Sequence, residues 1–430
     1  MASVNGSNGS GAATRSTQDR GYVPERIVRD KSGGAFGYFE VTHDVTDYTS
    51  AGFLSRVGKR TGVLARFASV ANEYACAETT DRNPRGFAVK FYTAEGTYDV
   101  VGNNTPVFVI RDAMRFPEFI HSQRRDARTG LRDANRMWDF FSLFPESLHQ
   151  VTHLMGDRGL PLGWQFMNGY GKHTFQWING AGKAVWVKYH FKTELGVKNM
   201  TRQEAASIAC EDTAFHRRSL FDLIDRGDVA SWALNVQIMT VEDAAACSFD
   251  PFDVTKVWPH KEFPLIPVGR LVLNRNPENF HTDIEQAAFE PSNFVRGVWY
   301  SPDKMLHARL FAYADGHRYQ IGTNPAAEQK KYRGPVRTLP ETATGELERA
   351  ARNDDYVQAG DLYRLMPRDA QVRLVDTIVG MLDPVRRDIQ VRAVSNFTKC
   401  DATFGEQLAR GLALNEDRGP ASVVMAAQNW

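Results

Sequence analysis

An arginine, a tyrosine and a histidine follow one another at intervals of four residues in the last third of the chain. Arg309, Tyr313 and His317 would share one face of a helix, with the guanidinium one turn from the phenol. A guanidinium beside a phenol favours the phenolate, which is a hard anionic donor that suits ferric iron, including haem iron. An ordinary core tyrosine with a surface arginine has the same spacing, and the spacing by itself favours that simpler interpretation.

The sequence on either side of Tyr313 allows a more specific interpretation of this segment. The run 309–318 is similar to the haem-ligand signature of the monofunctional haem catalases, and similarity to that family extends from Pro24 to Asn324. The runs that carry the resemblance are 36–42, 84–92, 102–106, 119–123, 145–150, 157–159, 167–171, 257–260 and 301–306. The chain is therefore identified as a small-subunit member of the catalase family.

The resemblance implies an α+β protein with the catalase fold, which is an antiparallel β-barrel with helical insertions, a wrapping loop and a C-terminal helical region. Runs with alternating apolar positions agree with barrel strands, at 36–42, 86–92, 163–166, 173–178 and 184–192. Thr201 followed by Glu204 forms a capping-box pattern that predicts a helix within 201–226. Helical spacing in the C-terminal region is shown by Leu362, Leu365, Val372, Leu374, Ile378 and Leu382.

Composition and resemblance together divide the chain into five segments. Residues 1–20 are poor in apolar side chains, and we expect them to be a disordered tail. The others are expected to be a haem-binding barrel core at 21–325, a wrapping loop at 326–353, a helical region at 354–415 and a tail at 416–430. The family implies a homotetramer, but the short N-terminal arm would interlock subunits less, so that a dimer is the alternative.

Bulk composition argues against several classes of partner. Lys and Arg total 52 against 51 for Asp and Glu, which leaves no net field to attract nucleic acid or an anionic membrane. The cysteines Cys76, Cys210, Cys247 and Cys400 are scattered, as is usual in a reducing compartment. With no membrane-spanning run, no secretory signal and no peroxisomal tripeptide, a cytoplasmic location is expected.

The resemblance assigns roles around haem b. Tyr313 is expected to be the axial iron ligand, with Arg309 as the cation that keeps it ionised. The other implied haem contacts are Arg26, Arg66 and His317 toward the propionates, Phe116 stacked on the distal face, and Val28 and Val70 along the approach. One propionate contact departs from the family, because Gln320 stands where an arginine is usual.

The distal side of the implied haem site departs more strongly. The family's Val-His-Ala-Lys reads Val28-Arg29-Asp30-Lys31, so that Arg29 replaces the histidine that moves the peroxide proton. An arginine stays protonated and cannot serve as a general base. Asp30 is the nearest residue able to replace that base, although a salt bridge to a neighbouring cation is the simpler interpretation.

Three further positions belong to the same distal unit. Asn103, which the family uses to orient its substrate, is retained. Ala68 replaces the serine that normally supports the histidine, and Asn83 replaces an aspartate near the access channel. Because general acid–base help is typically worth roughly 10²–10⁴-fold, we expect fast dismutation of hydrogen peroxide to be impaired.

Three hypotheses for function follow from these residues. The first is a haem-dependent oxidoreductase that uses peroxide or an oxygen species on an organic substrate, through peroxidase, peroxygenase or hydroperoxide-converting chemistry. The second is a hydrogen-peroxide catalase of reduced efficiency. The third is a non-catalytic haem-binding protein, which retention of Tyr313, Arg309, Asn103 and Phe116 disfavours.

The family's NADPH pocket implies a second site. The matching positions are His149, Arg158, Asn168, Lys192, Trp258 and His260. Arg158 and Lys192 would donate charge-assisted hydrogen bonds to the phosphates. His153 replaces a usual aromatic residue and Gly156 a usual serine, so that the pocket is altered in this chain.

Overall fold

The computed structural model describes residues 32–69, 82–321 and 354–414. Their contacts divide the chain into two compact units. The barrel unit comprises 1–106, 158–254 and 258–351, and the helical unit comprises 107–157, 255–257 and 352–430. The predicted tails at 1–20 and 416–430 and the wrapping loop at 326–353 lie outside the described residues.

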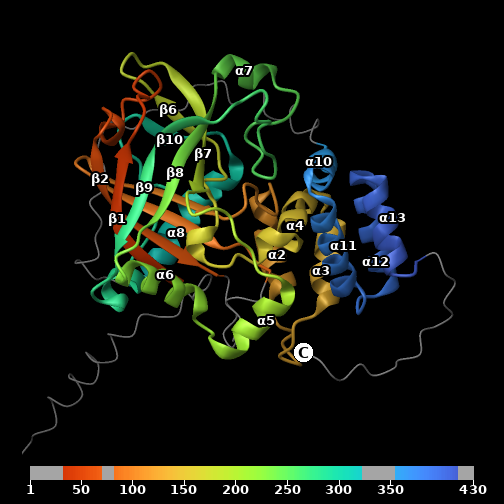
Figure 1. The fold of residues 1–430 in the computed structure, drawn as a ribbon. Coiled ribbons are helices and arrows are strands. Elements are labelled where there is room, and N and C mark those ends of the chain that lie inside the picture. Colours follow the sequence, from red (N-terminus) through yellow and green to blue (C-terminus); the bar gives the residue numbers. More distant parts are fainter. Residues whose placement is uncertain (1–31, 70–81, 322–353, 415–430) are drawn as a thin grey trace, which may run out of the picture. The chain divides into compact units, whose positions relative to one another are not determined.

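The described strands of the barrel unit form one antiparallel sheet in the order β10-β6-β7-β5-β4-β3-β2-β1-β9-β8, and β7 also pairs with β8. This last pairing closes eight of them into a barrel, with β6 and β10 attached beside β7 (Figure 1). The strands are β1 (Ser32–Val41), β2 (Arg60–Ala68), β3 (Gly86–Thr93), β4 (Gly96–Asn103), β5 (Gly169–Tyr170), β6 (Phe175–Ile178), β7 (Ala184–Thr193), β8 (Ala230–Met239), β9 (Ile266–Arg275) and β10 (Val298–Tyr300). The predicted antiparallel barrel is thus confirmed.

One predicted strand is wrong. Residues 163–166 form a single 3₁₀ turn, η5 (Trp164–Phe166), in which the amide of Phe166 donates to the carbonyl of Gly163 at 3.1 Å. Trp164 and Gln165 are both buried although they are adjacent, which a half-buried strand does not permit. Packing of Trp164 against Phe67, with ring centroids 5.6 Å apart, therefore outweighed the local alternation.

Alternation along the strands separates an apolar interior from a partly polar outer face. In β3, Phe87, Val89 and Phe91 belong to the interior cluster, whereas Lys90 faces outward and is buried against Asp99 at 2.7 Å. The interior is filled by large aromatic rings packed edge to face, such as Phe67 on Phe87 with centroids 5.2 Å apart. The barrel is thus a solid core, and ionisable side chains are left to its outer surface.

Helices of the barrel unit are α5 (Arg202–Glu211), α6 (Phe215–Asp225), α7 (Val241–Ala246) and α8 (Lys304–Ile321). The predicted capping box is confirmed at α5, where the Thr201 hydroxyl accepts from the amide of Glu204 at 3.2 Å. The helix predicted within 201–226 is divided in two, because α5 ends at Glu211 and α6 begins at Phe215. The short turns of the described chain are η1 (Gly52–Leu54), η2 (Ala113–Arg115), η3 (Pro145–Ser147), η4 (Asp157–Gly159), η5 and η6 (His281–Glu285).

The helical unit joins two separate segments of the chain. Its helices are α2 (Phe116–Gln123), α3 (Ala134–Leu143), α4 (Leu148–Met155), α10 (Val357–Leu365), α11 (Arg368–Leu382), α12 (Arg387–Cys400) and α13 (Ala402–Gly411). The C-terminal helices lie beside α3 and α4 (Figure 1), and the Asn396 amide of α12 donates to the carbonyl of Ser142 in α3 at 2.8 Å. None of the described helices is long and apolar enough to cross a bilayer.

The apolar pattern predicted for the C-terminal helices is right in part. Leu374, Ile378 and Leu382 are buried along one face of α11, as expected. Leu365 and Val372 are instead 83% and 43% exposed. Leu365 is the last residue of α10 and lies past the point where the helix packs on its neighbours, so that local spacing was no guide there.

Close approach of β4 and β5 leads to a test of barrel packing. A Cβ at Gly102 would overlap the backbone carbonyl of Tyr170, so we expect Gly102→Ala to lower the free energy of unfolding by about 3 kcal/mol or more. The control is Gly62→Ala, where a Cβ meets nothing within 4 Å and the change should stay within about 0.5 kcal/mol. Urea unfolding measures both, and equal midpoints would contradict the packing argument.

Candidate active site

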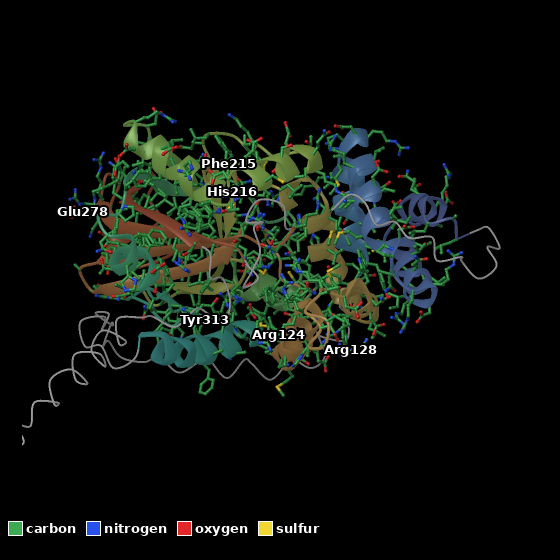
Figure 2. All side chains as sticks on the ribbon, turned by 90° about the horizontal axis from the view of Figure 1, so that it is seen from below. Arg124, Arg128, Phe215, His216, Glu278 and Tyr313 are labelled. Atoms are coloured by element: carbon green, nitrogen blue, oxygen red, sulfur yellow. The ribbon has the colours of Figure 1, made fainter. Side chains whose placement is uncertain are left out.

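Arg309 and Tyr313 contact one another on α8, as their spacing predicts. The Arg309 Nη2 atom donates to the Tyr313 hydroxyl at 2.9 Å, and the guanidinium carbon lies 4.9 Å from the ring centroid. Asp303 precedes the helix and caps it, since its Oδ1 accepts from the amide of Leu306 at 3.0 Å. Figure 2 shows Tyr313 on this helix, beside the strands of the barrel.

Arg309 is itself held by two further residues that sequence reasoning missed. Its Nη1 atom donates to His173 Nε2 at 2.6 Å, and His173 Nδ1 lies 2.6 Å from Asp303 Oδ2. Since a guanidinium only donates, Nε2 must accept and the proton of the neutral ring resides on Nδ1, directed at the carboxylate. Asp303, His173, Arg309 and Tyr313 therefore form a continuous chain of hydrogen bonds, called here the proximal relay.

Burial keeps the His173 imidazole of this relay neutral. The His173 side chain is only 2% exposed, and burial lowers its pKa to about 4, opposed by the charge of Asp303 and assisted by those of Arg309 and Lys172. The residue before it, Lys172, has a φ of 60°, and the His173 amide donates to the carbonyl of Gly171 at 2.7 Å. This is a γ-turn of the strained, positive-φ kind, and it sets the direction in which His173 leaves the sheet.

The outer face of the barrel supplies the other described haem candidates. Arg66 and Asn103 are buried, and alternation from the interior residues places them on the outer side of β2 and β4. Tyr313 packs against an apolar cluster on that same side, formed by Leu64, Ala88, Val101, Ile284 and Phe289. A phenol oxygen held by a cation, beside apolar surface and a buried arginine, is a donor set that fits haem.

Two predicted departures from the family lie near these strands. Ala68 ends β2 and pairs with Ser32 and Gly86 in the sheet. Asn83 accepts from Arg85 Nη1 through both its side-chain oxygen, at 2.5 Å, and its carbonyl, at 3.0 Å. Arg85 in turn is fully buried, and its carbonyl accepts from the Asn103 amide at 3.1 Å.

Several predicted site residues cannot be assigned to this geometry. Phe116 begins α2 in the helical unit, where its ring centroid lies 6.4 Å from that of Phe108. The backbone of His317 and Gln320 belongs to α8, but their side chains are outside the described part. The predicted contacts that lie wholly outside the described residues are Arg26, Val28, Arg29, Asp30 and Val70.

Three of the predicted nucleotide-binding residues converge on a phenol that sequence reasoning missed. The Tyr170 hydroxyl accepts from Arg158 Nη1 and Lys192 Nζ, each at 3.3 Å, and from Asn168 Nδ2 at 3.4 Å. Burial alone would raise the pKa of Tyr170, but the charges of Arg158 and Lys192 outweigh it, so that its pKa lies below the usual value. Two cations and an amide thus surround one oxygen atom.

The remaining predicted nucleotide positions fall in both units. The His260 ring lies 5.7 Å from that of His190, which in turn packs edge-on against Tyr170 at 5.5 Å. Trp258 is buried behind them in the barrel unit. His149 belongs to the helical unit, where its Nδ1 lies 3.2 Å from the carbonyl of Thr255 and its ring stacks on that of His153 at 5.0 Å.

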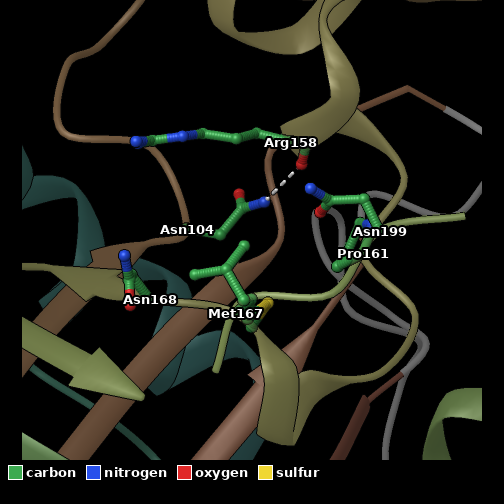
Figure 3. Close-up of a pocket in the computed structure, with 7 residues that line it drawn as sticks. Asn104, Arg158, Pro161, Met167, Asn168 and Asn199 are labelled. Atoms are coloured by element: carbon green, nitrogen blue, oxygen red, sulfur yellow. Dashed lines mark hydrogen bonds between the residues drawn. The ribbon is translucent and has the colours of Figure 1, made fainter. Parts of the chain in front are cut away.

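A small pocket adjoins this cluster. Three asparagine amides and the side chain of a methionine face it (Figure 3). Its lining residues are Asn104, Arg158, Pro161, Met167, Asn168, Val197 and Asn199. Because the Asn104 amide donates to the carbonyl of Arg158 at 3.1 Å, the pocket shares its wall with the residues around Tyr170.

Fold and site together define an α+β protein built on a closed antiparallel barrel, with a phenol held by an arginine on its outer side. Known families share this arrangement. The sequence model of the family described as Catalase matches residues 12–329, and that of the family described as Catalase-related immune-responsive matches 349–412. The chain belongs to the catalase family.

Individual relatives agree with this membership. A bromoperoxidase-catalase of Streptomyces venezuelae is 48% identical over 91% of this chain and 89% of its own length. Rat catalase is 44% identical over 94% and 84%. Catalase A from Saccharomyces cerevisiae has a similar structure, with a TM-score of 0.84 and 37% identity over 93% of this chain and 92% of its own.

The neutral state of His173 predicts how stability depends on pH. In the unfolded chain His173 takes up a proton near its ordinary pKa of 6.5, but in the folded protein only near 4. Its stabilising contribution is therefore complete above pH 6.5 and is lost as the pH falls toward 4, by an amount on the order of 3 kcal/mol. Urea unfolding at pH 7 and pH 4.5 should show His173→Gln to be less sensitive to acid than the unmodified protein.

A surface histidine supplies the control for this measurement. The His43 side chain is exposed, and its ring lies in hydrogen-bond contact with the hydroxyl of its neighbour Thr42. His43→Gln should keep the full loss of stability between the two pH values, to which the buried rings of His190 and His216, each with a pKa lowered to about 3 by burial, also contribute. An unchanged acid sensitivity in His173→Gln would contradict the neutral relay.

Proposed function

We propose that this member of the catalase family is a haem-dependent oxidoreductase in which Tyr313 binds the haem iron. We further propose that it uses peroxide or an oxygen species mainly on an organic substrate. One observation carries the proposal: Arg309 is 2.9 Å from the Tyr313 hydroxyl and is anchored from behind by His173. Such an arrangement serves to stabilise negative charge on the phenol oxygen, which an ordinary core tyrosine does not need.

Bound haem would supply the redox chemistry toward peroxide, and the chain's own residues would set its ligand and surroundings. Arg309 stabilises the phenolate, while His173 and Asp303 hold the guanidinium in place. The buried Arg66 is suited to a propionate through charge-assisted hydrogen bonds. The apolar cluster beside Tyr313 excludes water from the phenol.

The choice of an organic substrate rests on Arg29. Its guanidinium donates hydrogen bonds and attracts anions but cannot take up the peroxide proton. Such a group suits a peroxide anion or the carboxylate of an organic substrate, and Asn103 would remain to orient it. A relative named bromoperoxidase-catalase supports the view that this fold carries oxidations besides dismutation.

A hydrogen-peroxide catalase of reduced efficiency is the second candidate. Asn103 is fully buried and its amide is positioned by the carbonyl of Arg85 at 3.1 Å. This favours a substrate-orienting role that survives the loss of the distal histidine. Several relatives with similar coverage are named simply catalase, which also supports dismutation as a residual activity.

We also propose that the cations around Tyr170 bind the phosphates of NADPH. Arg158 is exposed and Lys192 partly exposed, so that both can reach a ligand, and their present partner is the hydroxyl of Tyr170. The convergence of these donors on a single oxygen supports an anion-binding role. Asn168 adds a neutral donor at the same place.

Assembly and location belong to the same proposal. We propose a homo-oligomer, a tetramer or a dimer, in the cytoplasm. Exposed apolar side chains support self-association, with Met114 83% and Phe311 77% exposed in their respective units. The described cysteines Cys210 and Cys400 form no disulfide, as a reducing compartment favours.

The iron ligand can be tested spectroscopically. Tyr313→Phe removes the phenol oxygen but keeps the ring against its apolar neighbours, so we expect a folded protein that loses the Soret band of tyrosine-ligated haem. Tyr92→Phe is the matched control, because Tyr92 lies on β3 with its side chain 46% exposed, and its spectrum should equal that of the unmodified protein. A Tyr313→Phe spectrum identical to the original would exclude Tyr313 as the ligand.

Oxygen evolution from hydrogen peroxide tests the role of Arg29. At matched haem content we expect a rate about 10²–10⁴-fold below that of an ordinary haem catalase, since a general base is missing. Arg29→His should recover part of this deficit, and Arg29→Lys, which keeps the charge, should not. A high rate in the unmodified protein would establish an efficient catalase and contradict the organic-substrate proposal.

A further inference from the structure

A buried carboxylate lies at the far end of the proximal relay. The Asp303 side chain is 2% exposed, and its Oδ2 accepts from His173. Burial by itself raises the pKa of Asp303, but its electrostatic interaction and hydrogen bond with His173, the bond to the amide of Leu306 and, as the smallest of these contributions, the charge of Lys188 bring it below the usual value. His173 is neutral, so that the carboxylate's charge needs a cation from elsewhere.

Lys188 is the cation that the sheet brings to this point. It lies on β7 between the interior residues Val187 and Tyr189, so that its side chain leaves the barrel on the outer face. Phe175 pairs with Val187, and the Gly171 amide donates to the carbonyl of Tyr189 at 3.0 Å. The stretch 171–175, which carries His173, therefore runs alongside Lys188.

The segment of Asp303 is tied to the same place. The Ser301 hydroxyl donates to the carbonyl of Thr174 at 2.5 Å, and continuation of the β6–β7 register sets Thr174 opposite Lys188. Lys188 is only 5% exposed, and its ammonium nitrogen lies 5.5 Å from the ring centroid of Trp258. Its surroundings thus combine an aromatic face with buried carboxylates.

Electrostatics agrees with this placement. Burial lowers the pKa of Lys188 to about 8, and Asp303 is the first of the charges that oppose this shift, ahead of Asp253 and Asp250. Lys188 is therefore charged at neutral pH in a place where water is scarce. The other cations near the relay, Arg309 and Lys172, act on His173.

We propose that Lys188 is a positioning residue that balances the charge of Asp303 and thereby fixes the proton of His173 on Nδ1, so that Arg309 stays bonded to Tyr313. It acts through Asp303 and His173. The inference rests on the proposed function only where it concerns haem, because the proton on His173 can be observed without it.

The consequence of removing the Lys188 charge follows from the hydrogen-bond donors and acceptors of the proximal relay. An uncompensated Asp303 takes up a proton and becomes a donor to His173 Nδ1. The ring proton must then reside on Nε2, where it faces the Arg309 guanidinium, which is also a donor. Arg309 loses one of the two anchors of its Nη1 atom and keeps only the carbonyl of Val101 at 3.2 Å, so that its hydrogen bond to the Tyr313 oxygen is weakened.

Two substitutions separate charge from packing. Lys188→Met keeps an unbranched aliphatic side chain but removes the ammonium that lies over Trp258, whereas Lys188→Arg keeps the charge. Lys90→Met is the matched control, because Lys90 is also a buried lysine on the outer face of the barrel and is paired with Asp99 at 2.7 Å. The Lys90→Met variant loses the same buried positive charge, but at a residue that is not a member of the proximal relay.

The first measurement is the imidazole ¹⁵N shift of His173 in the full-length, ¹⁵N-histidine-labelled protein without added haem, assigned with His173→Gln. We expect a protonated Nδ1 in the unmodified protein, in Lys188→Arg and in Lys90→Met, and a proton moved to Nε2 in Lys188→Met. A His173 signal in Lys188→Met identical to the original would overturn the proposal. So would the same change in Lys90→Met, which would show a general effect of lost buried charge.

The second measurement uses haem-loaded protein and follows transfer of haem to excess apomyoglobin. Because the Arg309 guanidinium is less well anchored, haem should be released about tenfold faster from Lys188→Met, which is the equivalent of one charge-assisted hydrogen bond. In Lys188→Arg the rate of haem release should rise by less than about threefold. If Lys188→Met does not fold, Lys188→Arg and Lys188→Gln replace it, and equal His173 signals in those two would overturn the proposal. If the protein takes up no haem but shows the expected His173 shifts, the proposed haem-dependent function is contradicted. The proposed role of Lys188 is then still supported.

Discussion

A guanidinium held between an imidazole and a phenol is the interaction on which the site depends. Arg309 donates in both directions, at 2.6 Å to His173 and at 2.9 Å to Tyr313. Because arginine keeps its proton, it fixes the roles of both partners: the imidazole must accept, and the phenol oxygen is favoured as an anion. A lysine would supply the charge but not the rigid fork that spans the two.

The barrel makes this interaction possible by keeping its polar residues on the outside. Its interior is filled with aromatic and aliphatic side chains, which leaves the outer faces of β2, β4 and β7 to carry Arg66, Asn103 and Lys188. These residues are buried all the same. Charges are thus held where water is scarce, so that each one strongly affects its neighbours.

The proximal and distal sides of the proposed haem site differ in how closely their residues match the catalase pattern. The proximal relay is intact and its members are mutually satisfied, which argues that a phenolate ligand is still required. On the proposed distal side, the resemblance implies that Arg29, a permanent cation, stands in place of a base and that Ala68 stands in place of a supporting hydroxyl. The proposed function, altered oxidative chemistry, rests on this combination of a conserved-type ligand arrangement and a proposed change of base.

The sequence by itself was enough for features that depend on neighbours along the chain. The spacing of Arg309 and Tyr313 predicted their contact, because four residues make one helical turn. Thr201 and Glu204 predicted a capping box, and alternation predicted four of the five proposed strands. The resemblance to catalases supplied the fold as a whole, since its motifs extend over most of the chain.

Only the tertiary structure could reveal the partners that complete the site. His173 and Asp303 are 130 positions apart. Tyr170 accepts hydrogen bonds from β7, from η4 and from the residue before β5, so that no single local spacing predicts the cluster. The turn at 163–166 was misread for the same reason, because Trp164 is fixed by a ring on a distant strand. Periodicity records which side of an element is apolar, whereas the pairing of buried polar groups is decided by closure of the barrel.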